Sequence, residues 1–154
     1  MPDEQPCGAA EAADRYFQEG FNCAQSVLRA VAEARGQACP ACIPAVALGM
    51  GGGIGHTGRA CGALTGAVMA IGLAVDRAVG GPIVARKAEA HRLAGQLVEA
   101  FASHFGSSDC AALLGFAWTA PGAVQRFERE NLKAARCTVC VRWAAAEADR
   151  LLGG

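Results

Sequence analysis

The sequence predicts an all-α fold, and three observations support this prediction. The apolar residues are mainly Ala, Val and Leu with few aromatic residues, a composition typical of closely packed helices. Apolar positions recur at helical spacing through most of the chain, and no stretch shows the alternation of a half-buried strand. Gly and Pro separate these stretches. We expect one domain over residues 1–154, flexible at 1–8, with a compact bundle of about five to six helices at 9–152.

The N-terminal part predicts two helices and a short connection. Residues 9–18 favour a helix that ends at Gly20. Asn22 is a suitable N-cap for a second helix over 23–34, which has an apolar stripe and therefore packs inward. The segment 39–48 contains two prolines and is either a short helix or an extended connection.

A glycine-rich loop within residues 49–66 precedes the predicted central helix. Each glycine loses extra conformational entropy on folding, so such a run needs a reason such as positive φ or close approach of a bound group. Cys61 lies where the loop becomes a helix, and the helix dipole and free N–H groups there favour a thiolate. The helix, 62–79, has almost no polar face and is expected to be buried, with Gly66 and Gly72 allowing a neighbour to approach closely.

The C-terminal part predicts a long amphipathic helix, a short helix and a final helix. The segment after Pro82 separates an apolar face from a charged face and ends at Gly106. A short helix begins at Cys110 behind capping residues, and the final helix covers 137–152. Residues 116–131 show no clear pattern.

Charge and targeting signals bear on partners and location. The 14 basic residues balance 14 acidic residues, so nothing indicates a nucleic acid or an anionic membrane as partner. The polar N-terminus lacks the features of a secretory signal, which predicts a cytoplasmic protein. The apolar run 61–75 stops at Asp76 and Arg77, so we expect no membrane insertion. A largely apolar central helix favours a homodimer.

Eight cysteines are the strongest signal in the composition. A reduced cytoplasmic protein of this length needs no disulfide framework, so metal binding or redox chemistry is the expected use of its thiols. Each cysteine alone is also explained as a small buried hydrophobe. However, Cys23, Cys61 and Cys110 each begin a predicted helix. If these ends converge with Cys137, helix dipoles and N–H groups would support four thiolates suited to an iron–sulfur cluster.

Several motifs together carry a family resemblance. They are residues 20–27, the glycine run, 61–67, 105–113 and 137–145. In these the chain resembles the C-GCAxxG-C-C family, described as putative redox-active proteins, and also the C-terminal part of split-Soret cytochrome c. The resemblance covers nearly all of the chain after residue 10. It implies a redox role and suggests an iron–sulfur cluster, with the family's four cysteines falling on Cys23, Cys61, Cys110 and Cys137.

The chain departs from the family pattern in two ways. Its central motif is Cys61-Gly62-Ala63, where the family label has Gly-Cys-Ala. Four cysteines are additional to the pattern: Cys7, Cys39, Cys42 and Cys140. Cys140 is therefore an alternate to Cys137 as the fourth ligand. No defined reaction comes with the family, so the resemblance identifies neither a substrate nor the redox partner protein that electron transfer requires.

Two alternative hypotheses rest on the C-x-x-C pairs. Cys39-Pro40-Ala41-Cys42 is similar to the dithiol of thioredoxin-like enzymes, although the βαβ setting is missing. Cys39 and Cys42 would then be the catalytic pair of a thiol/disulfide relay without a cofactor. Cys137 and Cys140 form a second pair, so a split zinc site in a structural or metal-handling protein is the other alternative.

The glycine run supplies further residues that could contact the cofactor. It satisfies G-x-G-x-x-G over 53–58, but no strand flanks it as in a Rossmann unit, and no lysine with Ser or Thr closes it as a P-loop. We expect the loop instead to bring backbone N–H groups close to the sulfurs, with Arg59 offsetting negative charge. The cofactor-binding residues predicted in this way are Gly52, Gly53, Gly55, His56, Arg59 and Gly62.

Overall fold

The computed structural model describes residues 8–154, and the regular elements within this range are helical. The α-helices are α1 (Ala9–Gln18), α2 (Cys23–Ala34), α3 (Cys42–Ala45), α4 (Gly62–Val79), α5 (Ile83–Phe105), α6 (Cys110–Leu114), α7 (Ala123–Arg129) and α8 (Thr138–Leu151). A 3-10 turn, η1 (Leu48–Met50), and a π-helical turn, η2 (Lys133–Cys137), complete the elements.

The all-α prediction is confirmed, but the described chain has eight α-helices where about five to six were predicted. The difference arises in 39–48 and 116–131, where the sequence pattern was ambiguous and the short helices α3 and α7 form. The predicted flexible segment 1–8, including Cys7, lies outside the described residues except for Gly8, which is the N-cap of α1.

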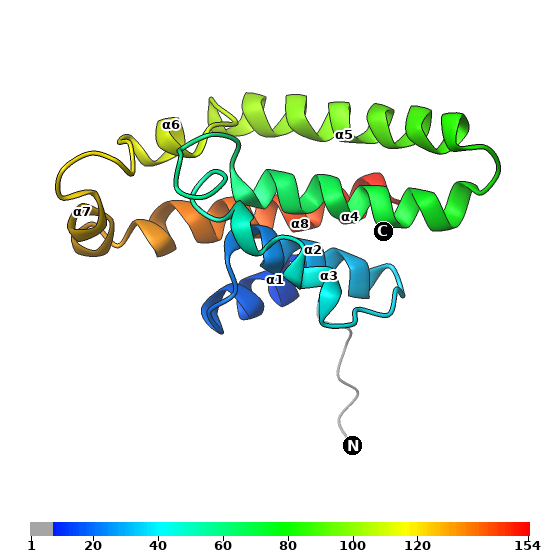
Figure 1. Cartoon of the computed structure of the whole chain (residues 1–154), viewed down its shortest axis with the longest axis horizontal. Helices are drawn as coiled ribbons and strands as arrows, with labels where there is room; N and C mark the ends of the chain where they lie inside the picture. Colours follow the sequence, from blue (N-terminus) through cyan, green and yellow to red (C-terminus); the bar gives the residue numbers. More distant parts are fainter. Residues whose placement is uncertain (1–7) are drawn as a thin grey trace, which may run out of the picture.

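Three helices form the centre of the bundle, because α2, α4 and α8 all pack against one another. α1 packs on α2 and α8, whereas α5 packs on α4 and α8 and lies on the far side of them from α1 (Figure 1). The largest fully buried side chains come from these layers and include Phe101, Leu28, Ile71 and Leu97. The prediction that the helix over residues 62–79 lies at the centre of the bundle is therefore confirmed, since this helix is α4.

Glycine allows α4 to lie close to α2. A Cβ atom added to Gly66 would overlap the backbone of Ala24, lying 2.9 Å from its Cα and overlapping its carbonyl oxygen. No heavy atom lies within 4 Å of a Cβ added to Gly72. The predicted close approach is therefore confirmed at Gly66 and wrong at Gly72, because Gly72 is on a side of α4 that faces no neighbour.

α4 is the one helix within residues 8–154 that is long and apolar enough to cross a membrane. This test uses length and composition alone, and the core helix of a soluble protein passes it as well. Eight residues of α4 are buried inside the bundle.

A capping box fixes the start of α2. The Asn22 side chain accepts a hydrogen bond from the Gln25 N–H at 2.9 Å, and the Gln25 side chain accepts one from the Asn22 N–H at 3.1 Å. The Asn22 amide also donates to the carbonyls of Ala47 and Leu48 at 3.1 and 3.0 Å. The Gln25 amide donates to the carbonyl of Pro44 at 3.1 Å. The predicted N-cap is confirmed, and it ties the chain around α3 and η1 to the start of α2.

Candidate functional site

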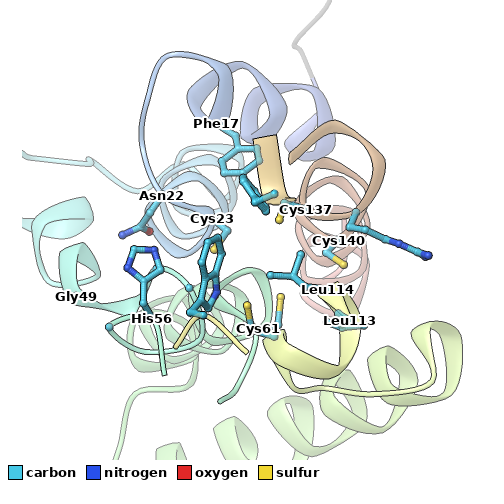
Figure 2. Close-up of a pocket in the computed structure, with 18 of the residues that line it drawn as sticks. Phe17, Asn22, Cys23, Gly49, His56, Cys61, Leu113, Leu114, Cys137 and Cys140 are labelled. Carbon is cyan, nitrogen blue, oxygen red and sulfur yellow. The ribbon is translucent and has the colours of Figure 1, made fainter. Parts of the chain in front are cut away.

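A cavity of about 360 Å³ lies where α2, α4, α6 and α8 begin. The cysteines that line it are Cys23, Cys61, Cys110, Cys137 and Cys140. Figure 2 shows the labelled members of this set on ribbons from separate parts of the chain, around one space. The structure thus gathers at one cavity the four cysteines singled out in the sequence, together with the alternate, Cys140.

Four of these cysteines occupy helix starts. Cys23 and Cys110 are the first residues of α2 and α6, and Cys61 is the N-cap of α4. Cys137 is the last residue of η2 and the N-cap of α8. The chain is therefore helical on both sides of Cys137, unlike at the other three cysteines. Cys140 lies in the first turn of α8 and is hydrogen-bonded to the thiol of Cys61.

The pKa values of the four thiols at helix starts are raised. Burial, together with the charge of neighbouring thiolates, raises the pKa of Cys23 and that of Cys137 to about 12. Burial also raises the pKa of Cys110. The hydrogen bond with Cys140, followed by burial, raises the pKa of Cys61 well above its usual range. Without a balancing positive charge, these groups are therefore neutral thiols at pH 7.

Backbone N–H groups act on these thiols in the opposite direction. The N–H groups of the first turn of α4 lower the pKa of Cys61, and those of Ala24 and Gly52 lower the pKa of Cys23. These contributions are smaller than those of burial and charge. We expected the helix start to lower the pKa of Cys61 and favour a thiolate, but the net effect of its surroundings is to raise this pKa. The reason is that the start of α4 is enclosed by the core and shielded from water.

Trp118 brings an unsatisfied donor to the same cavity. Its Nε1 is buried and makes no hydrogen bond within the described chain. The N–H is close enough to the Cys110 thiol to lower its pKa, although the contact falls short of hydrogen-bond geometry. The indole ring packs on His56 and Phe127, with ring centroids 4.8 and 5.1 Å apart. A buried donor without a partner costs about 1–3 kcal/mol, so an acceptor bound here would be stabilised.

The segment between η1 and α4 is a left-handed turn that folds back on itself. Residues 52–56 all have φ between 59° and 70°, including the non-glycine residues Ile54 and His56. The N–H groups of residues 54–59 all donate to carbonyls within 49–54. The N–H groups of residues 54–59 are thus used inside the turn, whereas the N–H of Gly52 lowers the pKa of the Cys23 thiol.

The structure separates the predicted loop residues into two groups. Those that line the cavity are Gly52, Gly55, His56 and Gly62. Gly53 lies behind the wall, where an added Cβ would be 2.7 Å from the Cβ of Cys110. Arg59 does not line the cavity and is exposed, so the structure does not support charge compensation by its side chain. Arg136, from η2, is the arginine that lines the cavity.

Several residues of the wall were not singled out as site residues in the sequence. They include Phe17, Asn22, Leu113, Leu114, Trp118, Phe127 and Arg136. Trp118 and Phe127 come from the segment without a clear pattern, and they pack around the start of α6 with Phe116 and Leu132. One signal was available, because aromatic residues are few in this chain and three of them fall within 116–127.

Cys39 and Cys42 lie outside this cavity. Cys42 is exposed, and Cys39 is partly buried in a separate groove. The two C-x-x-C pairs therefore share no cavity, so the structure does not support a zinc site split between them. Within residues 8–154, no three His, Cys, Asp or Glu side chains already converge closely enough to hold a single metal ion.

The raised pKa values predict a loss of stability at high pH in the metal-free protein. The thiols of Cys23 and Cys137 have an ordinary pKa of 9.0, which folding raises to about 12. Above pH 9 the unfolded chain loses these protons first, so the free energy of unfolding should fall by about 1.4 kcal/mol per pH unit for each thiol until about pH 12. Urea unfolding at pH 7, 9 and 10 measures this, and Cys23→Ala should reduce the slope. An equal slope in the variant would contradict the assignment.

Known protein families were compared with the sequence of this chain. A family model described as "Putative redox-active protein (C_GCAxxG_C_C)" matches residues 21–151, a range that includes all five cysteines of the cavity. No curated protein and no solved structure matches the chain significantly.

Proposed function

The chain belongs to the C_GCAxxG_C_C family of putative redox-active proteins, and on this basis we propose that its cysteine-lined cavity holds an iron–sulfur cluster used in electron transfer. The observation that best supports the proposal is that the helix starts bearing Cys23, Cys61 and Cys110 meet Cys137 at one cavity. When bound, the cluster would supply the ability to accept and release an electron. The roles below are those of the chain's own residues.

The donors around the cavity fit such a group. Iron–sulfur clusters are held mainly by cysteine thiolates, and a metal centre would add positive charge to that of Arg136 in the wall and of Lys133, whose charge lowers the pKa of Cys137. The N–H of Trp118, which has no partner in the described chain, is available to a sulfur. The N–H of Gly52 is directed at the sulfur of Cys23. Hydrogen bonds of this kind to sulfur tune the reduction potential of a cluster.

The spacing of the thiols favours a cluster over a single zinc ion. A zinc ion with four thiolates holds all four sulfurs about 2.3 Å from one point. The described residues show no such convergence, and the five cysteines are part of the lining of a cavity of about 360 Å³. A cluster distributes its ligands over several iron atoms, so it requires sulfurs spread around a space. Zinc binding is accordingly the second candidate and an outcome of the test below.

The contacts of the two candidate fourth ligands differ. Cys137 interacts electrostatically with Cys23, Cys61 and Cys110. The contact of Cys140 is with Cys61, whose thiol it meets through a hydrogen bond. We therefore assign Cys137 as the fourth ligand. Cys140 is then a positioning residue that holds the Cys61 side chain and contributes a further S–H group near its sulfur.

An anaerobic redox titration tests the proposed electron transfer. Protein reconstituted with iron and sulfide is reduced with dithionite and reoxidised while its visible absorption is recorded. We expect the charge-transfer absorption to bleach and to return without loss of iron. Absorption that does not change on reduction would exclude a redox role for the cluster. A parallel sample that binds zinc in preference to iron, and remains colourless, would instead support the metal-handling alternative.

Gly62→Ala should impair metal binding while sparing the fold. A Cβ at this position would overlap the Sγ of Cys23, which is the end of a side chain that can rotate away, and would lie 3.2 Å from the carbonyl oxygen of Met50 and 3.3 Å from the backbone nitrogen of Ala24. We expect at least about a tenfold loss of iron affinity, since the displaced sulfur is a ligand. Stability in urea should stay within about 1 kcal/mol, because the helix propensity of alanine offsets the cost of the small backbone shift at Met50 and Ala24.

Gly72→Ala is the matched control for Gly62→Ala. It makes the same change in the same helix, where no atom lies within 4 Å. Iron affinity should be that of the unsubstituted protein. Equal iron affinity in the two variants would contradict the assignment of Cys23 as a ligand.

A further inference from the structure

A second pair of thiols lies at the surface, apart from the cysteine-lined cavity. Cys42 is the first residue of α3 and is exposed, and Cys39 is partly buried. The chain between them forms a turn in which the N–H of Ile43 donates to the carbonyl of Pro40 at 2.9 Å. A thiolate at Cys42 also influences the thiol of Cys39. The turn therefore presents two neighbouring thiols, one open to solvent and one partly covered.

An apolar groove adjoins this pair. It has a volume of about 370 Å³, and its mainly apolar lining consists of Phe21, Cys39, Ala41, Pro44, Ala45 and Leu48 with the polar residues Gln25 and Arg29. Leu48 also lines the cysteine-lined cavity and so lies between the two. Leu48 and the nearby Val46 are 69% and 66% exposed, which makes them two of the most exposed large apolar side chains in the described chain. Large apolar side chains that stay open to water beside a reactive group indicate an interaction surface. The hydrogen bonds from Asn22 to Ala47 and Leu48 hold this segment in place.

We propose that Cys39 and Cys42 form a dithiol that reduces a protein disulfide, whose apolar flanking residues lie in the groove beside Leu48. In the first step, the sulfur of Cys42 attacks one sulfur of the partner's disulfide, and the other partner sulfur leaves as a thiol. Cys39 then attacks the sulfur of Cys42 in the mixed disulfide and releases the second partner thiol. The partner gains two electrons and two protons, and Cys39 and Cys42 lose them in forming their own disulfide.

The surroundings of the two thiols assign their order of attack. Cys42 is exposed and can reach a disulfide on another protein. Cys39 lies in the groove, where burial and the carboxylate of Glu33 raise its pKa, opposed by the guanidinium of Arg29. A covered thiol with a raised pKa is a poor first nucleophile but is well placed to attack the mixed disulfide next to it. This inference does not depend on a cluster in the other cavity.

Reaction with oxidised glutathione tests the pair. The full chain is used with Cys7→Ser in every form, and products are mapped by mass spectrometry. The parent should lose two hydrogen atoms at a peptide linking Cys39 to Cys42, without a lasting adduct. Cys39→Ser should keep one glutathione on Cys42, and Cys42→Ser should react at least about tenfold more slowly. A lasting adduct on the parent, or equal rates for the two variants, would overturn the proposal.

A second substrate tests the groove. A disulfide-linked dimer of a short peptide with leucine and valine beside its cysteine is compared with oxidised glutathione. Leu48→Asn should slow the reaction of the peptide by about fivefold and leave that of glutathione unchanged, because only the peptide has apolar residues for the groove. Equal rates with the peptide before and after this substitution would overturn the assignment of a protein disulfide as the substrate.

Discussion

Cys61→Ser is expected to lose at least about nine-tenths of the iron and sulfide that the parent chain binds after anaerobic reconstitution. Thiolate is the main ligand of iron–sulfur clusters, and a serine oxygen replaces it poorly. The fold should survive, because position 61 is the N-cap of α4 and serine is a favoured N-cap residue. Iron and sulfide per chain measure the loss, and far-ultraviolet circular dichroism verifies the helices.

Two further serine variants make the result specific. Cys42→Ser removes a thiol that does not line the cavity, so its iron content should equal that of the parent. Cys140→Ser should also keep its iron but shift the reduction potential, since it alters a group next to the sulfur of Cys61. Full iron content in Cys61→Ser, or loss of iron in all three variants alike, would contradict the proposed ligand set.

Gly66→Ala is expected to give the largest loss of stability from adding a single methyl group. The new Cβ would overlap the backbone of Ala24, which cannot rotate away as a side chain can. α2 and α4 would have to move apart at the centre of the bundle. We expect a loss of about 3 kcal/mol in the free energy of unfolding, and a fall in melting temperature of about 6–12 °C. Urea and thermal unfolding measure these quantities.

Gly72→Ala serves again as the comparison, because it lies in the same helix with open space around it. Alanine there should raise stability by up to about 1 kcal/mol through helix propensity. The two substitutions should therefore change stability in opposite directions. A loss of similar size in both would mean that glycine acts through backbone conformation in α4, and not through its contact with α2.

The fold could be predicted best where local signals mark a helix end. The bounds predicted for 9–18, 23–34 and 62–79 are those of α1, α2 and α4. Capping residues and glycines lie at these ends, and their effect is local to the chain. α7 was missed because a helix of seven residues has little stability of its own. It depends on neighbours in space, and no pattern along the sequence reports on those.

The cysteines of the candidate site could be predicted from the sequence, but several of the other residues that line its cavity could not. Cys23, Cys61 and Cys110 begin helices, and the sequence shows this directly. The net pKa of a thiol depends on how fully other segments enclose it, so the raised values could not be read from helix position alone. Trp118 reaches the cavity from a segment without regular pattern, and Arg136 reaches it from a π-helical turn. Neither placement has a signature in sequence spacing.

The iron and sulfide content of anaerobically reconstituted protein, measured with its visible spectrum, tests the central claim most directly. A cluster held by Cys23, Cys61, Cys110 and Cys137 predicts a brown protein that binds iron and sulfide in equal amounts. A colourless protein without iron after reconstitution would contradict the account, even if the five thiols of the cavity were all reduced and accessible.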